Sequence, residues 1–266
     1  MAEGGEATKR SEGKAFARLI DTIREESFKY LDEGHRRIGI IVNRVACARK
    51  LAAELRAPNK KKKALPEDAE VTLLTGRMRP IDRRRVVDEQ LRKFKADPRR
   101  EPLDRPHIVV ATQCLEVGAD LDFEVLISEC ASLDALQQRF GRLNRLGMNR
   151  DSRGCIVIRE DQVPSEENPA DDPIYGSSLG NTWEWLEESS AEAEPFDFGI
   201  EAVGRREWDR ERLEMPSVQC PVILPVHLDM WAQTSPRPRP VPDVGPFLHG
   251  PEKSLPEVFV CWRADL

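Results

Sequence analysis

The residues of this chain best suited to chemistry lie in the run 136–147, Leu-Gln-Gln-Arg-Phe-Gly-Arg-Leu-Asn-Arg-Leu-Gly. On a helical wheel at about 100° per residue, Gln138, Arg142 and Arg145 fall on one face, opposite the apolar residues. Guanidinium groups are always charged and match phosphate oxygens in pairs, so this face suits the charge that builds on a transferring phosphoryl group. A solvated basic face is the alternative explanation of the arginine pair. Gly141 inside a helix costs about 1 kcal/mol relative to alanine, which indicates a close approach to its backbone.

Three further segments follow apolar, strand-like runs. The first is Ala-Thr-Gln-Cys-Leu-Glu-Val-Gly-Ala-Asp at 111–120, and the others are Asn-Arg at 43–44 and Thr-Gly-Arg at 75–77. Parallel strands present their carboxyl ends at one edge, where open α/β sheets bind ligands. Backbone amides and small side chains at such an edge can follow a sugar-phosphate backbone without reading bases. For Thr112, an ordinary helix N-cap is the alternative.

Five short apolar runs predict the strands that must position these segments: 38–42, 71–74, 107–111, 124–128 and 154–158. Runs with helical periodicity separate them, at about 16–31, 46–55 and 81–94 and from 133 onward. Strands that alternate with helices predict a parallel sheet with helices on both faces, so the expected fold class is α/β.

The spacing Gln-Arg-x-Gly-Arg-x-x-Arg resembles motif VI of superfamily 2 helicases, and the run 111–120 resembles motif V. The ends of the first two predicted strands are similar to motif IV and the segment after it. The resemblance implies a second RecA-like motor domain, in which helices sandwich a parallel sheet. It places Arg142 and Arg145 at the arginine-finger positions and Gln138 at the position facing the γ-phosphate.

The same resemblance assigns ligands to the remaining residues. It implies that Gly118, Asp120 and Arg139 lie against the nucleotide, which is ATP with Mg²⁺. Residues expected to contact nucleic acid lie at the strand ends: Asn43, Arg44, Thr75, Gly76, Arg77 and Thr112. Magnesium is expected to be held mainly by a first motor domain, so we expect no metal site in this chain.

Three runs resemble one family, the CRISPR-associated helicase-nuclease of type I systems. They are the run 113–122, the Arg-Leu-Asn-Arg-Leu-Gly ending of motif VI, and the tail at 226–236, which most resembles the type I-U branch, also called I-G. The resemblance covers the chain from about residue 14 to its end. It implies an ATP-driven motor on single-stranded DNA in antiviral defence. The implied partners are a first RecA-like domain, a nuclease domain and a guide-RNA surveillance complex.

Sequence motifs for the rest of such an engine are missing. A P-loop needs Gly-x-x-x-x-Gly-Lys-Ser/Thr, whereas the Gly-Lys pair at 13–14 is followed by alanine. The run 32–35, Asp-Glu-Gly-His, spells a DExH box but ends a predicted helix with no P-loop before it. None of the four histidines precedes an aspartate, as the family's nuclease motif requires. We therefore expect the chain to supply arginine fingers and part of the DNA track, and not to hydrolyse ATP alone.

Composition and charge narrow the class of protein. No apolar run approaches the roughly 18 residues of a membrane-spanning helix, and we expect a cytoplasmic protein with no membrane partner. The six cysteines are scattered without zinc-ligand spacing and are typical of reduced packing residues. Residues 1–150 carry 31 basic and 24 acidic side chains, whereas residues 151–266 carry 10 and 23. A polyanion is therefore expected to bind the first half.

We expect three segments: a disordered N-terminus at 1–13, the motor domain at 14–161 and an irregular accessory segment at 162–266. The accessory segment is acidic and Pro-rich, and its strand-like last run indicates a truncated end. Two other functions fit the same motifs. One is the motor half of a DExH helicase acting in DNA repair or on RNA, because motifs IV to VI describe the engine and not its cargo. The other is a non-enzymatic module that binds single strands or a protein partner without turnover.

Overall fold

The structure is a computed structural model. It describes residues 2–57, 63–116, 120–149, 151–165, 172–190, 197–215, 221–236, 239 and 243–249. The chain divides into two compact units, Met1–Met215 and Pro216–Leu266. Within the described ranges, no helix is both long enough and apolar enough to cross a membrane.

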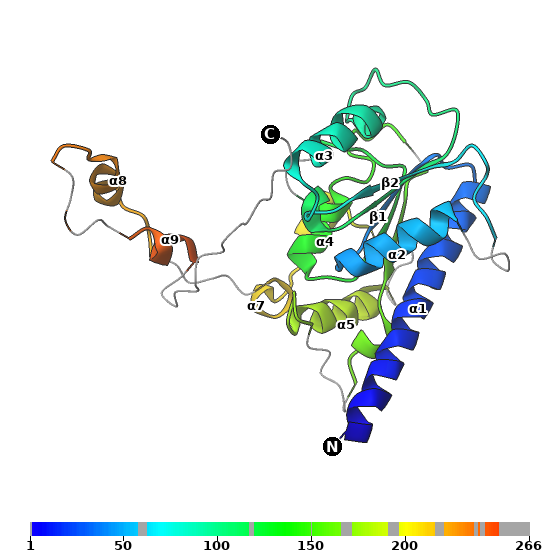
Figure 1. The fold of residues 1–266 in the computed structure, drawn as a ribbon, viewed down its shortest axis with the longest axis horizontal. Helices are drawn as coiled ribbons and strands as arrows, with labels where there is room; N and C mark the ends of the chain where they lie inside the picture. Colours follow the sequence, from blue (N-terminus) through cyan, green and yellow to red (C-terminus); the bar gives the residue numbers. More distant parts are fainter. Residues whose placement is uncertain are drawn as a thin grey trace, which may run out of the picture. The chain divides into compact units, whose positions relative to one another are not determined.

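A five-stranded parallel sheet forms the centre of the first unit (Figure 1). Its strands are β1 (Arg37–Ile41), β2 (Glu70–Leu74), β3 (His107–Ala111), β4 (Val125–Glu129) and β5 (Arg153–Val157). In space their order is β2-β3-β1-β4-β5, and every pairing is parallel. The register sets Ile40 of the central strand opposite Val110 on β3 and Ile127 on β4. The predicted α/β fold is confirmed, and each strand limit lies within one residue of its predicted position.

Two long helices, α1 (Ala2–Asp32) and α2 (Val45–Arg56), cover one face of the sheet (Figure 1). Alternate strand residues point to this face, and they share one apolar core with both helices. Its members include Leu19, Ile20, Ile23, Leu51, Leu55, Ile38, Ile40, Ile108, Val110 and Ile127. Strand β1 is buried on both faces, which explains why its sequence is a continuous apolar run rather than an alternating one.

The elements on the other face of the sheet pack around a second apolar core. In chain order they are α3 (Pro80–Arg85), the π-helical turn η1 (Val86–Gln90), the 3-10 turns η2 (Arg92–Phe94) and η3 (Gln113–Leu115), α4 (Leu133–Phe140) and α5 (Ser178–Ser190). The helix predicted over 81–94 is thus three consecutive pieces. Leu91 and Phe94 are buried in the second core, whereas α3 itself has no buried residue, so packing fixes only the end of this segment.

The structure differs from the expected domain limits at both ends of the motor domain. Helix α1 begins at Ala2, inside the stretch that we expected to be disordered. At the other end, the compact unit continues past residue 161 to Met215, through η4 (Glu160–Gln162), α6 (Ile200–Gly204) and α7 (Arg210–Leu213). The reason is apolar burial, because Leu179 and Leu186 of α5 lie in the second core.

The second unit contains two described helices, α8 (Pro225–Ala232) and α9 (Gly245–His249). Ring contacts join them. The ring centroids of His227 and Phe247 lie 4.7 Å apart, and those of Trp231 and Phe247 lie 5.3 Å apart. The strand-like run at the end of the chain, from which we expected truncation, lies outside the described residues.

Candidate phosphate-binding edge of the sheet

Three of the predicted site segments follow the carboxyl ends of strands in one parallel sheet, whereas motif VI lies in and after α4. Residues 43–44 follow β1, residues 75–77 follow β2 and Thr112 follows β3. From β1 the chain runs to one side, through β2 and β3, and then crosses to β4 and β5 on the other side. This reversal at β1 and β4 is the kind of position where open α/β sheets bind ligands.

The predicted helical face of motif VI is wrong in one respect. Helix α4 ends at Phe140 with Gly141 as its C-cap, so Arg142 and Arg145 lie in the loop after the helix. The backbone N–H of Phe123 donates to the Arg142 carbonyl, and the N–H of Asn144 donates to the Phe123 carbonyl. Asn144 has a positive φ of 45°. These bonds to the segment before β4 replace the continuing helix, whereas Gln138 remains exposed in the last turn of α4.

Arg142 is half-buried and ties motif VI to motif V. Its Nε donates to the Leu115 carbonyl at 3.3 Å, and its NH2 group donates to the Glu116 carbonyl at 2.8 Å. Burial lowers the pKa of Arg142, the neighbouring positive charge of Arg145 lowers it further, and Asp120 opposes both effects. Two like charges therefore lie close together beside the motif V segment, an arrangement that an anion would stabilise.

Arg145 combines a fixed backbone with an exposed side chain. Its N–H donates to Asp122 Oδ1 at 2.7 Å, and the buried Asp122 carboxylate also pairs with Arg100 at 2.7 Å. The Arg145 guanidinium lies at the surface, 3.1 Å from Asp120. Exposed ion pairs contribute only about 0–1 kcal/mol, so an arriving phosphate can displace Asp120 at little cost.

Arg139 does not fit the nucleotide contact that we predicted for it. Its side chain is fully buried, and its five N–H groups donate to five acceptors. They are Glu116 Oε1, Ser128 Oγ, the Glu129 carbonyl, Asn43 Oδ1 and the Tyr175 hydroxyl, at distances of 2.7 to 3.0 Å. A guanidinium with every donor occupied has none left for a phosphate, so the geometry is that of a structural hub.

Asn43 is likewise buried, so its predicted contact with nucleic acid does not match this geometry. Its amide donates to the Cys130 carbonyl at 2.7 Å and accepts from Arg139, and its backbone N–H donates to Glu129 Oε2 at 2.7 Å. Burial raises the pKa of Glu129, and the Asn43 N–H only partly offsets this effect. Of the two motif IV residues, Arg44 alone reaches solvent, and its guanidinium lies 3.5 Å from Asp172.

The other predicted contacts divide between buried and exposed positions. Thr75 and Thr112 are buried, whereas Gly76 and Arg77 are exposed. Thr112 stands at the N-cap position of η3 but makes no side-chain capping bond, and its N–H donates to the Leu74 carbonyl. Gly118 lies outside the described residues.

Sequence reasoning missed three residues of this network: Gln113, Glu116 and Tyr175. Gln113 donates to the Asn43 carbonyl at 2.9 Å and to the Tyr175 hydroxyl at 3.4 Å. Glu116 is the carboxylate partner of the buried Arg139. Gln113 and Glu116 belong to the motif V run. Had the burial of Arg139 been known, the need for nearby acceptors would have indicated them. Tyr175 lies in an irregular stretch with no periodic signal.

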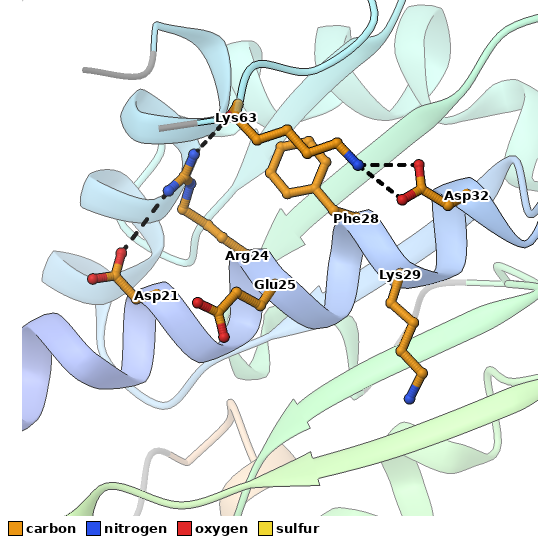
Figure 2. A pocket seen from close by; sticks show the side chains of 7 residues that line it. All are labelled: Asp21, Arg24, Glu25, Phe28, Lys29, Asp32 and Lys63. Carbon is orange, nitrogen blue, oxygen red and sulfur yellow. Dashed lines mark hydrogen bonds and ion pairs between the residues drawn. The ribbon is translucent and has the colours of Figure 1, made fainter. Parts of the chain in front are cut away.

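A small pocket of about 490 Å³ lies elsewhere, between α1 and Lys63. Figure 2 shows two ion pairs between its lining residues, with Lys63 reaching Asp32 at 2.8 Å and Arg24 lying 3.9 Å from Asp21. The Lys63 Nζ also lies 5.0 Å from the Phe28 ring centroid. None of the predicted site residues lines it. A second hollow of about 550 Å³ borders the edge itself, and Leu74, Leu115 and Asp120 are among its lining residues.

Comparison with known proteins finds similar sequences for the part of the chain that holds these motifs. Residues 34–147 match the family model described as the C-terminal part of the CRISPR-associated nuclease/helicase Cas3. This part of the chain therefore resembles the C-terminal helicase domain of Cas3 proteins. The matched range includes every predicted site residue of the Cas3-like domain and excludes Tyr175.

Curated relatives and a solved structure agree with this assignment. The Cas3 of Haloferax volcanii is 34% identical over 104 residues, which are 39% of this chain and 10% of that protein. The Cas3 of Streptococcus thermophilus is 33% identical over 135 residues, 51% of this chain and 13% of that protein. The crystal structure of T. fusca Cas3-AMPPNP has the same fold, with a TM-score of 0.50 and 23% identity over 64% of this chain and 20% of that one. The chain thus spans about a tenth of the length of these curated relatives.

Proposed function

We propose that this chain is the C-terminal motor half of an ATP-dependent single-stranded DNA translocase that acts in CRISPR type I interference. The observation that carries the proposal is the pair Arg142 and Arg145, two neighbouring positive charges whose side chains lie against the motif V segment, at Leu115, Glu116 and Asp120. Paired guanidinium groups stabilise charge on a transferring phosphoryl group without reorganisation when they are already positioned.

The two arginines have different parts in this proposal. ATP with Mg²⁺, when bound, supplies the phosphoryl group, and a first motor domain holds the metal. Arg145 leaves Asp120 and turns toward the phosphate, because its backbone is fixed and its guanidinium is exposed. Arg142 stays on the carbonyls of Leu115 and Glu116. A shift of Arg142 toward the phosphate therefore also moves the motif V segment.

That segment links the nucleotide to the proposed DNA track. Thr112 is only three residues from Leu115, and the exposed Gly76 and Arg77 follow the neighbouring strand β2. The backbone N–H of an exposed glycine and the side chain of an exposed arginine can both bind phosphate oxygens, and neither contact is specific for a base. Closure around ATP would thus be transmitted to the grip on a single strand.

ATP hydrolysis in this proposal requires a P-loop from another domain. The sequence contains no Gly-x-x-x-x-Gly-Lys-Ser/Thr, so we propose that a first RecA-like domain supplies it and that this chain alone is inactive in ATP hydrolysis. A nuclease domain and a guide-RNA surveillance complex complete the proposed set of partners. The match to Cas3 proteins supports these partners.

Reconstitution tests the proposal. ATPase activity is measured for this chain alone, for a P-loop half from the same locus alone, and for the two together, each with and without single-stranded DNA. The expected result is activity in the mixture only, stimulated by DNA. ATP hydrolysis by this chain alone would refute the split engine. A mixture that binds single strands but never hydrolyses ATP would favour a non-enzymatic binding module, and stimulation by RNA but not by DNA would favour an RNA helicase.

A further inference from the structure

A tight turn at residues 172–176 brings the segment after the Cas3-like match against the motif residues. The Asp172 Oδ1 accepts from the N–H groups of Ile174 and Tyr175, and backbone bonds between Asp172 and Gly176 close the turn. Asp172 Oδ2 accepts from Gln162 at 2.6 Å. These bonds hold the turn without help from the motif residues, and the turn fixes where the Tyr175 ring enters the core.

Tyr175 has only 3% of its surface exposed, and its hydroxyl meets two motif residues. Arg139 NH2 donates to it at 2.7 Å, and Gln113 Nε2 donates to it at 3.4 Å. The Arg139 guanidinium carbon also lies 5.9 Å from the Tyr175 ring centroid. One phenol thus contacts motif V through Gln113 and motif VI through Arg139.

The path continues from Arg139 to Arg142 through Glu116. Arg139 Nε binds the Glu116 carboxylate at 2.8 Å, and Arg142 donates to the carbonyl of the same residue at 2.8 Å. The side chain of Glu116 is therefore bound by Arg139, and its backbone carbonyl binds Arg142. A shift of the Arg139 guanidinium would move Glu116 and with it the Arg142 guanidinium.

We propose that Tyr175 is a positioning residue of the motor, whose hydroxyl fixes Arg139 so that Arg139 and Glu116 set the place of Arg142. The catalytic part of this inference rests on the proposed function, whereas the positioning part does not. The role belongs to the hydroxyl and not to the ring, because the ring alone would fill the second core equally well as phenylalanine. Loss of the hydroxyl leaves a buried charged donor without an acceptor, which moves the guanidinium.

The experiment compares Tyr175→Phe with Tyr30→Phe. Tyr30 is the only other tyrosine in the chain, it is buried in the first core, and it touches none of the motif residues. Hydrogen exchange is followed at the amides of Glu116 and Arg142, whose bonds run to the carbonyls of Gln113 and Arg139. We expect exchange about tenfold faster at both amides in Tyr175→Phe, and unchanged in Tyr30→Phe. Arg139→Lys keeps the charge and loses the same bond, so it must raise exchange at Glu116 even if Tyr175→Phe does not fold.

The reconstituted motor supplies the second measurement. With Tyr175→Phe we expect kcat about tenfold lower and KM for ATP within about twofold of the wild type, because the bond acts on a transition-state group. Tyr30→Phe should leave both constants unchanged. Unchanged exchange at Glu116 and Arg142 would overturn the inference, as would an equal loss of kcat in both variants. A wild-type mixture without ATPase activity would count against the proposed function, and the exchange measurement would still decide the positioning role.

Discussion

Two regions of the molecule differ in how their charges are paired: the starts of the strands, and the contact between motifs V and VI. At the amino edge of the sheet, each of two carboxylates has its own basic partners. Glu70 lies 2.6 Å from Lys93 and 3.0 Å from His107, and Glu124 lies 3.0 Å from Arg37. Burial opposes ionisation of both carboxylates, but these partners hold the pKa of each below its usual value. Charge at this edge is matched within the fold and stabilises it.

The contact between motifs V and VI leaves positive charge without an equal number of acidic partners. Arg142 and Arg145 are close enough to affect each other's charge, and the exposed Asp120 is the acid that interacts with both. Beneath this surface, the buried Arg139 has an acceptor for every N–H of its guanidinium, and Glu116 supplies the opposite charge. The comparison indicates that a motif can contain both kinds of arginine, one that stabilises the fold and others that are available to a ligand.

The largest stability effect is expected from Arg139→Met. It removes the buried guanidinium and takes one donor each from Glu116 and four other acceptors, which should cost about 3–5 kcal/mol of unfolding free energy. Urea unfolding measures it. The matched variant Arg205→Met, at the exposed C-cap of α6, should change stability by less than about 0.5 kcal/mol. Similar values for the two variants would show that Arg139 is not a structural hub.

His107 should make stability depend on pH. It is fully buried, and burial, assisted by the charge of Lys93, lowers its pKa to about 4. As the pH falls from 6.5 to 4, the unfolded chain binds a proton that the folded chain does not, so unfolding free energy falls by up to about 3 kcal/mol. His107→Gln should flatten this slope in urea unfolding at pH 7, 6 and 5, whereas His227→Gln in the second unit should not. A slope that survives His107→Gln would mean that other groups cause it.

Glu124→Gln should cost about 2 kcal/mol at pH 7. The carboxylate accepts from the N–H groups of Arg36 and Arg37 and from the Arg37 guanidinium, and charged acceptors make the stronger bonds. Because the folded-state pKa is lowered, this contribution is present at neutral pH and is lost as the pH falls through that pKa. Urea unfolding at pH 7 and pH 3 checks both statements. The exposed Glu67→Gln is the control, and an equal loss in both variants would contradict the matched amino edge.

The smallest stability effect is expected from Asp120→Asn at the contact between motifs V and VI. Its exposed ion pair with Arg145 is worth less than about 1 kcal/mol, so unfolding should hardly change. A fluorescent ATP analogue should bind the reconstituted motor severalfold more tightly at low salt, because a carboxylate that competes with the phosphate for Arg145 is gone. Fluorescence anisotropy measures the affinity, and Asp104→Asn, which is exposed before β3, is the control. Equal affinities for the two variants would place Asp120 away from the anion site.

The sheet could be predicted from the sequence because each strand is an apolar run whose burial decides its structure, as in β1 and β3. Motif order predicted that Arg142 and Arg145 act on the phosphate, and this stays a prediction. The wheel was wrong beyond Phe140, since bonds from Phe123 end the helix there, and such a partner lies outside any local pattern. Burial of Arg139 could not be foreseen for a similar reason, because its five acceptors come from four separate places in the chain, Tyr175 among them.

We propose above all that the exposed arginine, Arg145, acts on the phosphoryl group. The most direct test is kcat of the reconstituted, DNA-stimulated ATPase with Arg145→Ala, measured beside Arg99→Ala, which removes an exposed charge from the loop before β3. The account predicts a loss of about 10³-fold for Arg145→Ala and none for Arg99→Ala. A kcat for Arg145→Ala equal to that of Arg99→Ala would contradict it.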